Sequence, residues 1–133
     1  MRTTVNTTFT HPERLHLWER SLVGDATLDA ELLANLWHPQ GSFQIGAMPQ
    51  VTGREAIRGF FEQFFSMGLF ARLDHELIEV WDLEDALIYS AVAVYTRADG
   101  STLRVPYTNT VKYEDGLFGD YRVYIDTAPL MAR

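Results

Sequence analysis

Residues 103–127 constrain the fold most, because they have the pattern of two neighbouring strands joined by a tight turn. Along residues 103–113, apolar side chains alternate with Thr, Arg and Lys. A period of two places one face of a strand on a core and the other in water. Glu114-Asp115-Gly116 makes the turn, and residues 117–127 form the second strand. The sequence therefore predicts an antiparallel hairpin at the end of the chain.

Two polar residues break this hairpin's apolar pattern. Asn109 falls among the apolar positions of the first strand, so the alternation points it inward. Asp126 lies near the end of the second strand, which is otherwise aromatic and β-branched. An amide and a carboxylate among apolar residues on neighbouring strands predict a pocket within the core.

The first half of the chain alternates helical patterns with one short strand. Apolar residues at helical spacing predict helices over residues 10–25 and 29–38, with breaks at Gly24-Asp25 and His38-Pro39. Residues 42–46 have the pattern of a strand, and 47–51 that of a loop. The strongest helix covers residues 52–68, with a stripe of phenylalanines on one face.

From Leu73 onward the chain has the pattern of consecutive strands. Residues 73–82 alternate, residues 86–96 are apolar on both faces as in a central strand, and an acidic turn with Asp82 lies in solvent between them. Residues 1–10 form a flexible lead-in, and residues 11–133 form one domain. We therefore predict an α+β cone-shaped roll: a strongly curved antiparallel sheet with three N-terminal helices packed on its concave side. The open end of such a cone is a natural cavity for a ligand.

Composition excludes several classes of partner. The formal net charge of −7 and the pI of about 4.9 disfavour nucleic acid and anionic membranes, since both are bound through clustered Lys and Arg. Without cysteine the chain has no disulfide, thiol nucleophile or Cys-ligated zinc. Neither a membrane-spanning run nor the apolar part of a signal peptide is present in the sequence, so a cytoplasmic location is expected.

Four stretches of the sequence resemble the SnoaL-like group of the nuclear transport factor 2-like superfamily. They are residues 37–39, 51–61, 111–116 and 121–130, and the resemblance covers about residues 11–130. It implies the cone-shaped fold. The superfamily includes polyketide cyclases, steroid isomerases, scytalone-type dehydratases, epoxide hydrolases and non-enzymes, so the fold alone does not decide the activity.

Two of these chemistries lack their key residues in this chain. The general-base Asp of the steroid isomerases corresponds to Ile45 in this chain. Their protonated Asp, which donates a hydrogen bond to the substrate oxygen, corresponds to Asn109, and an amide can also donate such a bond. The Arg-x-Asp of the epoxide hydrolases falls at Ala91 and Ala93. The resemblance therefore argues against both activities.

Two other chemistries match in part. Asp126 occupies the place of the essential acid/base Asp on the last strand of SnoaL-type cyclases. His75 matches the histidine that follows the long helix of scytalone-type dehydratases, but the partner Asp of the first helix is missing near Leu22. The resemblance thus implies Asp126, His75 and Asn109 as candidate catalytic residues.

Each candidate also has a structural interpretation. Asp126 can act as a general acid or base at the pocket wall, or accept hydrogen bonds from the backbone that follows it. His75 can act near neutral pH, or simply bond to backbone. Asn109 can polarise a substrate carbonyl, or bond a neighbouring side chain. The aromatic residues expected to line the cavity and contact a substrate are Trp18, Phe64, Trp81, Tyr107 and Tyr124.

These observations support two functions. The first is an isomerase or lyase of the cyclase or dehydratase type, acting without cofactor or metal on a small apolar cyclic or carbonyl compound by proton transfer. The second is a non-catalytic module of the same fold that binds a small apolar ligand or a protein. Both predict a homodimer through an outer sheet face made by Val92, Val94, Val123 and Ile125.

Overall fold

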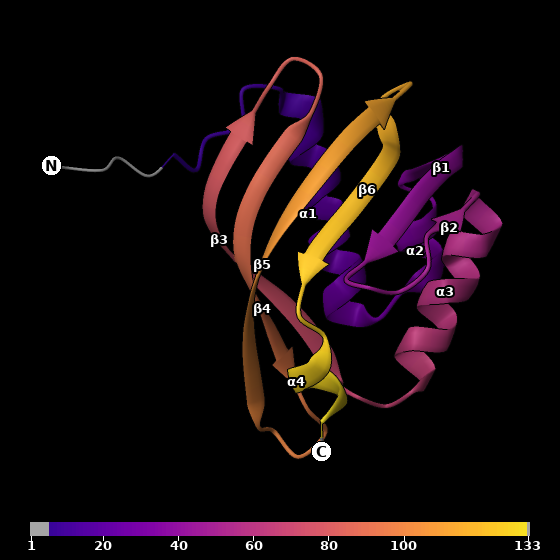
Figure 1. The fold of residues 1–133 in the computed structure, drawn as a ribbon, viewed down its shortest axis with the longest axis vertical. Coiled ribbons are helices and arrows are strands. Elements are labelled where there is room, and N and C mark those ends of the chain that lie inside the picture. Colours follow the sequence, from indigo (N-terminus) through magenta and orange to yellow (C-terminus); the bar gives the residue numbers. More distant parts are fainter. Residues whose placement is uncertain (1–5, 133) are drawn as a thin grey trace, which may run out of the picture.

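The structure is a computed structural model that describes residues 6–132. One sheet has the strand order β2-β1-β6-β5-β4-β3, and it curves around the helices (Figure 1). The elements are α1 (Pro12–Thr27), α2 (Ala30–Ala34), β1 (Trp37–Ile45), β2 (Val51–Thr52), α3 (Arg54–Ser66), β3 (Arg72–Asp82), β4 (Leu87–Thr96), β5 (Thr102–Glu114), β6 (Leu117–Ile125) and α4 (Ala128–Met131). The predicted α+β roll is confirmed.

The sheet is mixed rather than antiparallel throughout. Strands β3 to β6 form the predicted antiparallel meander. β1 instead pairs in parallel with β6, with Phe43 opposite Tyr121 and Ile45 opposite Val123. β1 also begins at Trp37, earlier than predicted. The short strand β2 begins at Val51, the last residue of the predicted loop, which pairs with Phe43. Periodicity along one strand does not reveal the direction of a partner far away in sequence, which explains the error.

The helices lie on the concave side of the sheet, and their number and ends differ slightly from the prediction. α1 lies behind the long strands and α3 beside β1 and β2, while a fourth short helix, α4, follows the sheet (Figure 1). α1 continues through Gly24 to Thr27 instead of ending at Gly24-Asp25. A Cβ added at Gly24 would lie 2.6 Å from two side-chain carbons of Leu33. Gly24 therefore permits a close approach of α1 to α2 and does not end the helix.

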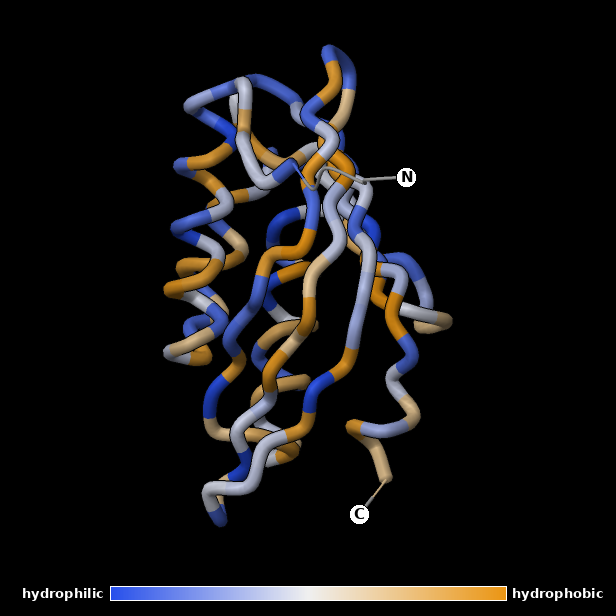
Figure 2. Tube along the Cα trace, turned by 90° about the vertical axis from the view of Figure 1, so that its left-hand side faces the viewer, coloured by the Kyte–Doolittle hydropathy of each residue, from blue (hydrophilic) through white to orange (hydrophobic). Residues whose placement is uncertain are grey.

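The core between helices and sheet is largely aromatic. The Trp37 ring lies 4.9 Å from that of Phe118, 5.3 Å from that of Tyr121 and 5.8 Å from that of Phe61, measured between centroids. Such tilted and edge-on pairs add to the free energy gained by burial alone. Polar and apolar residues alternate along the strands in Figure 2, as expected when one face packs on this core.

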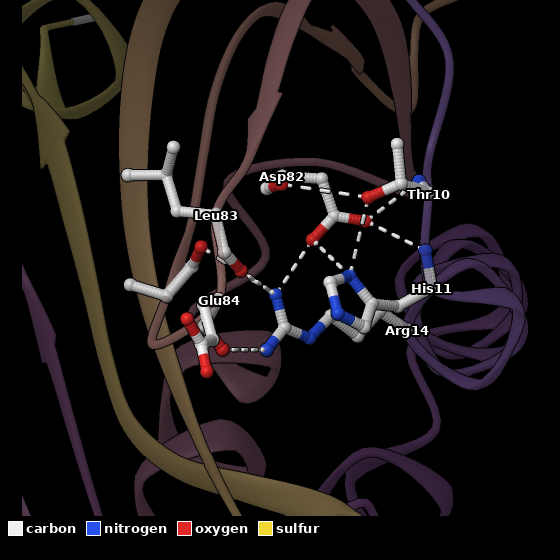
Figure 3. A network of polar contacts seen from close by, with 7 residues as sticks. Thr10, His11, Arg14, Asp82, Leu83 and Glu84 are labelled. Carbon is white, nitrogen blue, oxygen red and sulfur yellow. Dashed lines mark hydrogen bonds and ion pairs between the residues drawn. The ribbon is translucent and has the colours of Figure 1, made fainter.

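A buried ion pair fastens the start of α1 to the end of β3 (Figure 3). The Arg14 guanidinium donates to Asp82 Oδ1 at 2.6 Å, and to the backbone oxygens of Leu83 at 2.6 Å and Glu84 at 2.9 Å. The Asp82 side chain is only 1% exposed, so its predicted place in a solvated turn is wrong. Burial acts to raise the pKa of Asp82, but hydrogen bonds, that of His11 foremost, hold it below its usual value.

The described part of the lead-in also contacts β3. The Asn6 carbonyl accepts a hydrogen bond from the Val80 backbone at 2.6 Å, and the Phe9 ring lies 5.5 Å from that of Trp18. Residues 1–5 of the predicted lead-in lie outside the described residues. Within residues 6–132, no helix is both long enough and apolar enough to cross a membrane.

Candidate functional site

A cavity lies between the helices and the concave face of the sheet. Its volume is about 70 Å³, several times the roughly 10–15 Å³ that one water molecule needs. Its wall is mostly apolar and aromatic, with Phe60 and Phe64 of α3 on one side. The polar side chains in the wall are Ser21, Asp25, His75, Tyr95, Tyr107, Asn109 and Tyr121. An apolar pocket with a few convergent polar groups is the usual form of a small-molecule site.

His75 and Asp25 meet at this cavity. His75 Nε2 lies 2.7 Å from Asp25 Oδ2, and their side chains are only 12% and 17% exposed. His75 comes from β3, while Asp25 comes from the last turn of α1, at the predicted end of that helix. The position near Leu22, where the resemblance implied a partner Asp, carries no carboxylate, and Asp25, three residues later, is the carboxylate that contacts His75.

The sequence contains a signal for Asp25 that a longer first helix would have revealed. Leu17 and Ser21 are buried on α1. Asp25 lies four residues after Ser21 and eight after Leu17, so a continued helix places all three on one face. Ending the helix at Gly24 concealed this alignment.

Tyr107 extends the pair into a chain of three groups. Its hydroxyl lies 2.6 Å from His75 Nδ1. Burial raises the pKa of Tyr107 far above its usual value, and electrostatic interaction with Tyr89 and Asp25 adds to the effect. The phenol is therefore neutral, and its hydrogen is available for donation to Nδ1. In the tautomer that accepts this hydrogen, the imidazole hydrogen is on Nε2 and is donated to Asp25.

Asn109 forms a second polar cluster with two buried tyrosines. It is 2% exposed and lies on the inner face of β5, where the alternation places it. Its Nδ2 donates to the hydroxyls of Tyr89 at 2.7 Å and Tyr121 at 3.0 Å, and these hydroxyls lie 2.7 Å apart. Its Oδ1 has no hydrogen-bond partner among residues 6–132.

Asp126 does not reach the cavity. It is exposed just beyond β6, where its carboxylate accepts a hydrogen bond from the Ala128 backbone at 3.0 Å. Tyr121, Val123 and Ile125 are the residues of β6 that line the cavity, so the alternate positions face outward. The prediction of Asp126 as an acid or base at the pocket wall is wrong, and its structural interpretation is the one observed.

The predicted aromatic wall is correct at two positions, because Phe64 and Tyr107 line the cavity. Trp18 packs behind it, with its ring centroid 6.3 Å from that of Tyr89 in an edge-on pair. Trp81 and Tyr124 are 41% and 56% exposed, so their predicted contact with a substrate is wrong.

A β-bulge explains the error at Trp81. The register of β3 against β4 shifts between Leu77 and Glu79. Beyond the bulge, Val80 is fully buried and Trp81 lies on the outer side. The simple alternation had assigned Trp81 to the same face as His75.

The outer face of the sheet also differs from the prediction. Val92 and Val94 alternate with the buried residues of β4 and lie on that face. Val123 and Ile125 instead line the cavity. Exposed apolar area on the outer side comes from Ile78, 43% exposed, and Tyr124.

No group of three or more metal-binding side chains is found within residues 6–132. The histidine in the cavity bonds one carboxylate and one phenol. Groups of these types can transfer protons, because an imidazole can accept a proton and a carboxylate behind it stabilises the resulting cation.

Solved structures with this fold have very different sequences. TerC co-crystallised with polyporic acid shares 15% identity over 90% of this chain and 95% of its own, with a TM-score of 0.72. A Jannaschia sp. CCS1 protein described as a SnoaL-like polyketide cyclase shares 17% identity over 98% of this chain and 94% of its own, with a TM-score of 0.71. A Catenulispora acidiphila protein with a ketosteroid isomerase-like fold, in complex with trimethylamine, shares 13% identity over 88% of this chain and 86% of its own, with a TM-score of 0.72.

The comparison with curated proteins gave no match. The sequence model of the SnoaL-like domain matches residues 23–120, which include β1, α3, most of the meander and all residues of the two polar clusters except Tyr121. The curved sheet and its cavity agree with that assignment. The chain belongs to the SnoaL-like domain family, within the nuclear transport factor 2-like fold.

Proposed function

We propose that this protein is a cofactor-independent enzyme that transfers a proton on a small, largely apolar cyclic or carbonyl compound, as an isomerase, cyclase or dehydratase does. One observation carries the proposal: Asp25, His75 and Tyr107 form a hydrogen-bonded chain inside an apolar cavity. The cyclase and isomerase-like proteins of the same fold support this type of reaction, and the molecules bound in two of them support the binding of a small molecule.

The chain of groups allows a proton to move without a free tyrosinate. The substrate proton passes to the Tyr107 oxygen while the phenol hydrogen passes to His75 Nδ1. The imidazolium that forms keeps its Nε2 hydrogen on the Asp25 carboxylate at 2.7 Å, which stabilises the new positive charge. Reversal returns the proton to a different atom of the substrate, or to a leaving oxygen.

The cavity supplies the environment that this step needs. Its aromatic wall, with Phe60, Phe61 and Phe64 from α3, excludes water and limits the orientations of a bound ring. Interactions between charges are stronger in such a low-dielectric space than in water. The pair of buried tyrosines at Asn109 provides fixed dipoles at a second point of the same wall.

The non-catalytic module is the second candidate, and one observation favours it. Both nitrogens of His75 are already hydrogen-bonded, so the imidazole is fully satisfied without a substrate. In that function the Asp25 and Tyr107 contacts would only hold β3 and β5 against α1. The ligand would then bind without any chemical change.

Hydrogen–deuterium exchange distinguishes these functions without knowledge of the substrate. Cyclohexanone, cyclohexenone and tetralone are incubated with the protein in D₂O, and loss of the signal from hydrogens next to the carbonyl is followed by NMR. We expect exchange above the buffer rate for at least one compound. His75→Gln should lower it by about 100-fold or more, and Asp25→Asn should lower it as well.

The control is His16→Gln, since His16 is exposed on α1 outside the cavity. It should exchange at the wild-type rate. Binding of these compounds without exchange in the wild type would refute the enzyme and establish the binding module. Equal exchange in wild type and His75→Gln would also refute the proposed role of His75.

We also propose that the protein is a homodimer paired through the outer face of the sheet. Ile78 and Tyr124 expose large apolar side chains there, and Val92, Val94 and Pro106 lie on the same side. Covering such a face is favourable because it removes apolar area from water.

A further inference from the structure

The cluster of Asn109, Tyr89 and Tyr121 has one hydrogen more than its contacts use. The amide nitrogen and the two hydroxyls carry four hydrogens in total. Their three mutual contacts, at 2.7, 3.0 and 2.7 Å, use three of these hydrogens. One hydroxyl hydrogen is left over, and Asn109 Oδ1 lacks a partner within residues 6–132.

The observed orientation of the amide follows from the same count. With Nδ2 toward the tyrosines, each of the three short contacts contains a hydrogen. With Oδ1 toward them, the two hydroxyls would have to supply hydrogens to all three contacts, and one contact between oxygens would have none. The oriented cluster therefore offers one donor and one acceptor side by side.

Asn109 and Tyr121 both line the cavity. An unpaired acceptor in a residue only 2% exposed destabilises the protein when nothing bonds it. The group that satisfies both an unpaired hydrogen and an unpaired oxygen is a hydroxyl, because it accepts and donates at once.

We propose that the cavity binds its substrate through a hydroxyl group seated on Asn109 Oδ1 and the free tyrosine hydrogen, so that the substrate is a small hydroxylated single-ring compound. This inference rests on the proposed function, because the bound compound is a substrate only if the protein is an enzyme. Asn109 and the tyrosine pair then determine specificity, while Tyr107 and His75 act on the other side of the ring.

The size of the site agrees with a single ring. Tyr107 and Asn109 lie two residues apart on the same face of β5, which separates their Cα atoms by about 7 Å at 3.3–3.4 Å per residue. This spacing is similar to the length of one six-membered ring with its substituents. The cavity volume of about 70 Å³ is small, which agrees with a ligand of one ring.

Phenol and its methyl ether, anisole, test the inference directly. Both have one ring and one oxygen, but anisole cannot donate to Asn109 Oδ1. Affinities are measured by ligand-observed NMR for the wild type and for Asn109→Leu. We expect the ratio of phenol affinity to anisole affinity to fall by about tenfold in Asn109→Leu, since one hydrogen bond to a buried acceptor is lost. Comparing ratios cancels the different hydration of the two ligands.

Tyr113→Phe is the matched control. It removes a buried hydroxyl from the same strand, at a position outside the cavity lining. Its ratio should equal that of the wild type. If Asn109→Leu does not fold, intermolecular NOEs from phenol to the Asn109 side-chain amide hydrogens in the wild type replace it, and their absence would overturn the inference.

The outcomes separate this inference from the proposed function. If the ratio of phenol affinity to anisole affinity is unchanged in Asn109→Leu, the proposed hydroxyl-binding site is refuted, even if deuterium exchange depends on His75. If this ratio depends on Asn109 but the protein catalyses no exchange, the hydroxyl-binding site is supported and the enzyme is refuted. His75→Gln should lose exchange and keep the wild-type ratio, because His75 does not contact the Asn109 cluster.

Discussion

Replacing Asp82 with Asn should destabilise the protein strongly, although the two side chains have the same shape. Asp82 accepts hydrogen bonds from the backbone of Thr10 at 2.8 Å and of His11 at 2.9 Å, and from Arg14 at 2.6 Å. Its carboxylate is the counter-charge of Arg14, which is 7% exposed and lies 4.6 Å above the ring of Tyr113. An amide would leave that charge buried and unpaired.

The magnitude follows from these contacts. Removing one partner of a buried ion pair costs about 3–5 kcal/mol. Arg14 keeps its bonds to two backbone carbonyls, which places the loss at the lower end, near 3 kcal/mol. For a domain of this size that corresponds to a fall in melting temperature of about 10–15 °C. Since whole domains have about 5–15 kcal/mol of stability, the effect is large.

Urea unfolding followed by tryptophan fluorescence measures the loss, with Glu76→Gln as the control. Glu76 also lies on β3 and pairs with an arginine, Arg104, but both side chains are more than half exposed. Exposed pairs contribute about 0–1 kcal/mol. A loss in Asp82→Asn no larger than that of Glu76→Gln would refute the argument that this network fastens α1 to the sheet.

The remaining predictions concern pH, packing, the last strand and assembly. Because the pKa of Asp82 is lowered in the folded protein, the stability that Asp82 contributes is complete above about pH 4 and is lost as the pH falls through the folded pKa. Urea midpoints at several pH values should therefore show that Asp82→Asn loses less stability on acidification than the wild type does. Gly24→Ala should lower stability by about 1–3 kcal/mol in urea unfolding, because its Cβ would overlap Leu33. Asp126→Asn should change the free energy of unfolding by about 0.5 kcal/mol or less, since Asn also accepts from the following backbone; a gain of 1 kcal/mol or more in thermal unfolding would contradict its exposed position. Tyr124→Asp should convert the proposed dimer to a monomer at micromolar concentration, and light scattering that finds a monomeric wild type would refute the pairing.

Sequence periodicity predicted those parts of the fold that depend on neighbouring residues. The hairpin of β5 and β6 and the doubly apolar strand β4 were correct because each pairs with the next strand in the chain. Errors arose where a distant partner or an irregularity decides the structure. The parallel pairing of β1 with β6 is one case, and the bulge near Ile78 that turns Trp81 outward is the other. An inserted residue reverses every later assignment of faces, and nothing in the local alternation marks it.

The residues of the candidate site could also be predicted only in part. His75 and Asn109 were predicted to matter, and the structure places both at the cavity. Asp126 was assigned by its position in a family pattern, but such a match does not determine which face of β6 the side chain occupies. The acidic group at the cavity comes instead from Asp25, where the first helix had been predicted to end although it continues to Thr27.

Gly24 explains both the wrong prediction of the end of α1 and the position of Asp25 beside His75. In the sequence a glycine at this point indicates a helix end. In the structure it lets Leu33 of α2 pack directly against the α1 backbone, and the helix continues for one more turn. That turn brings Asp25 to 2.7 Å from His75. The close contact between two helices, rather than a polar motif, therefore determines where the carboxylate lies. A side chain at Gly24 should impair proton transfer as well as stability, because α1 cannot move away from Leu33 without carrying Asp25 with it.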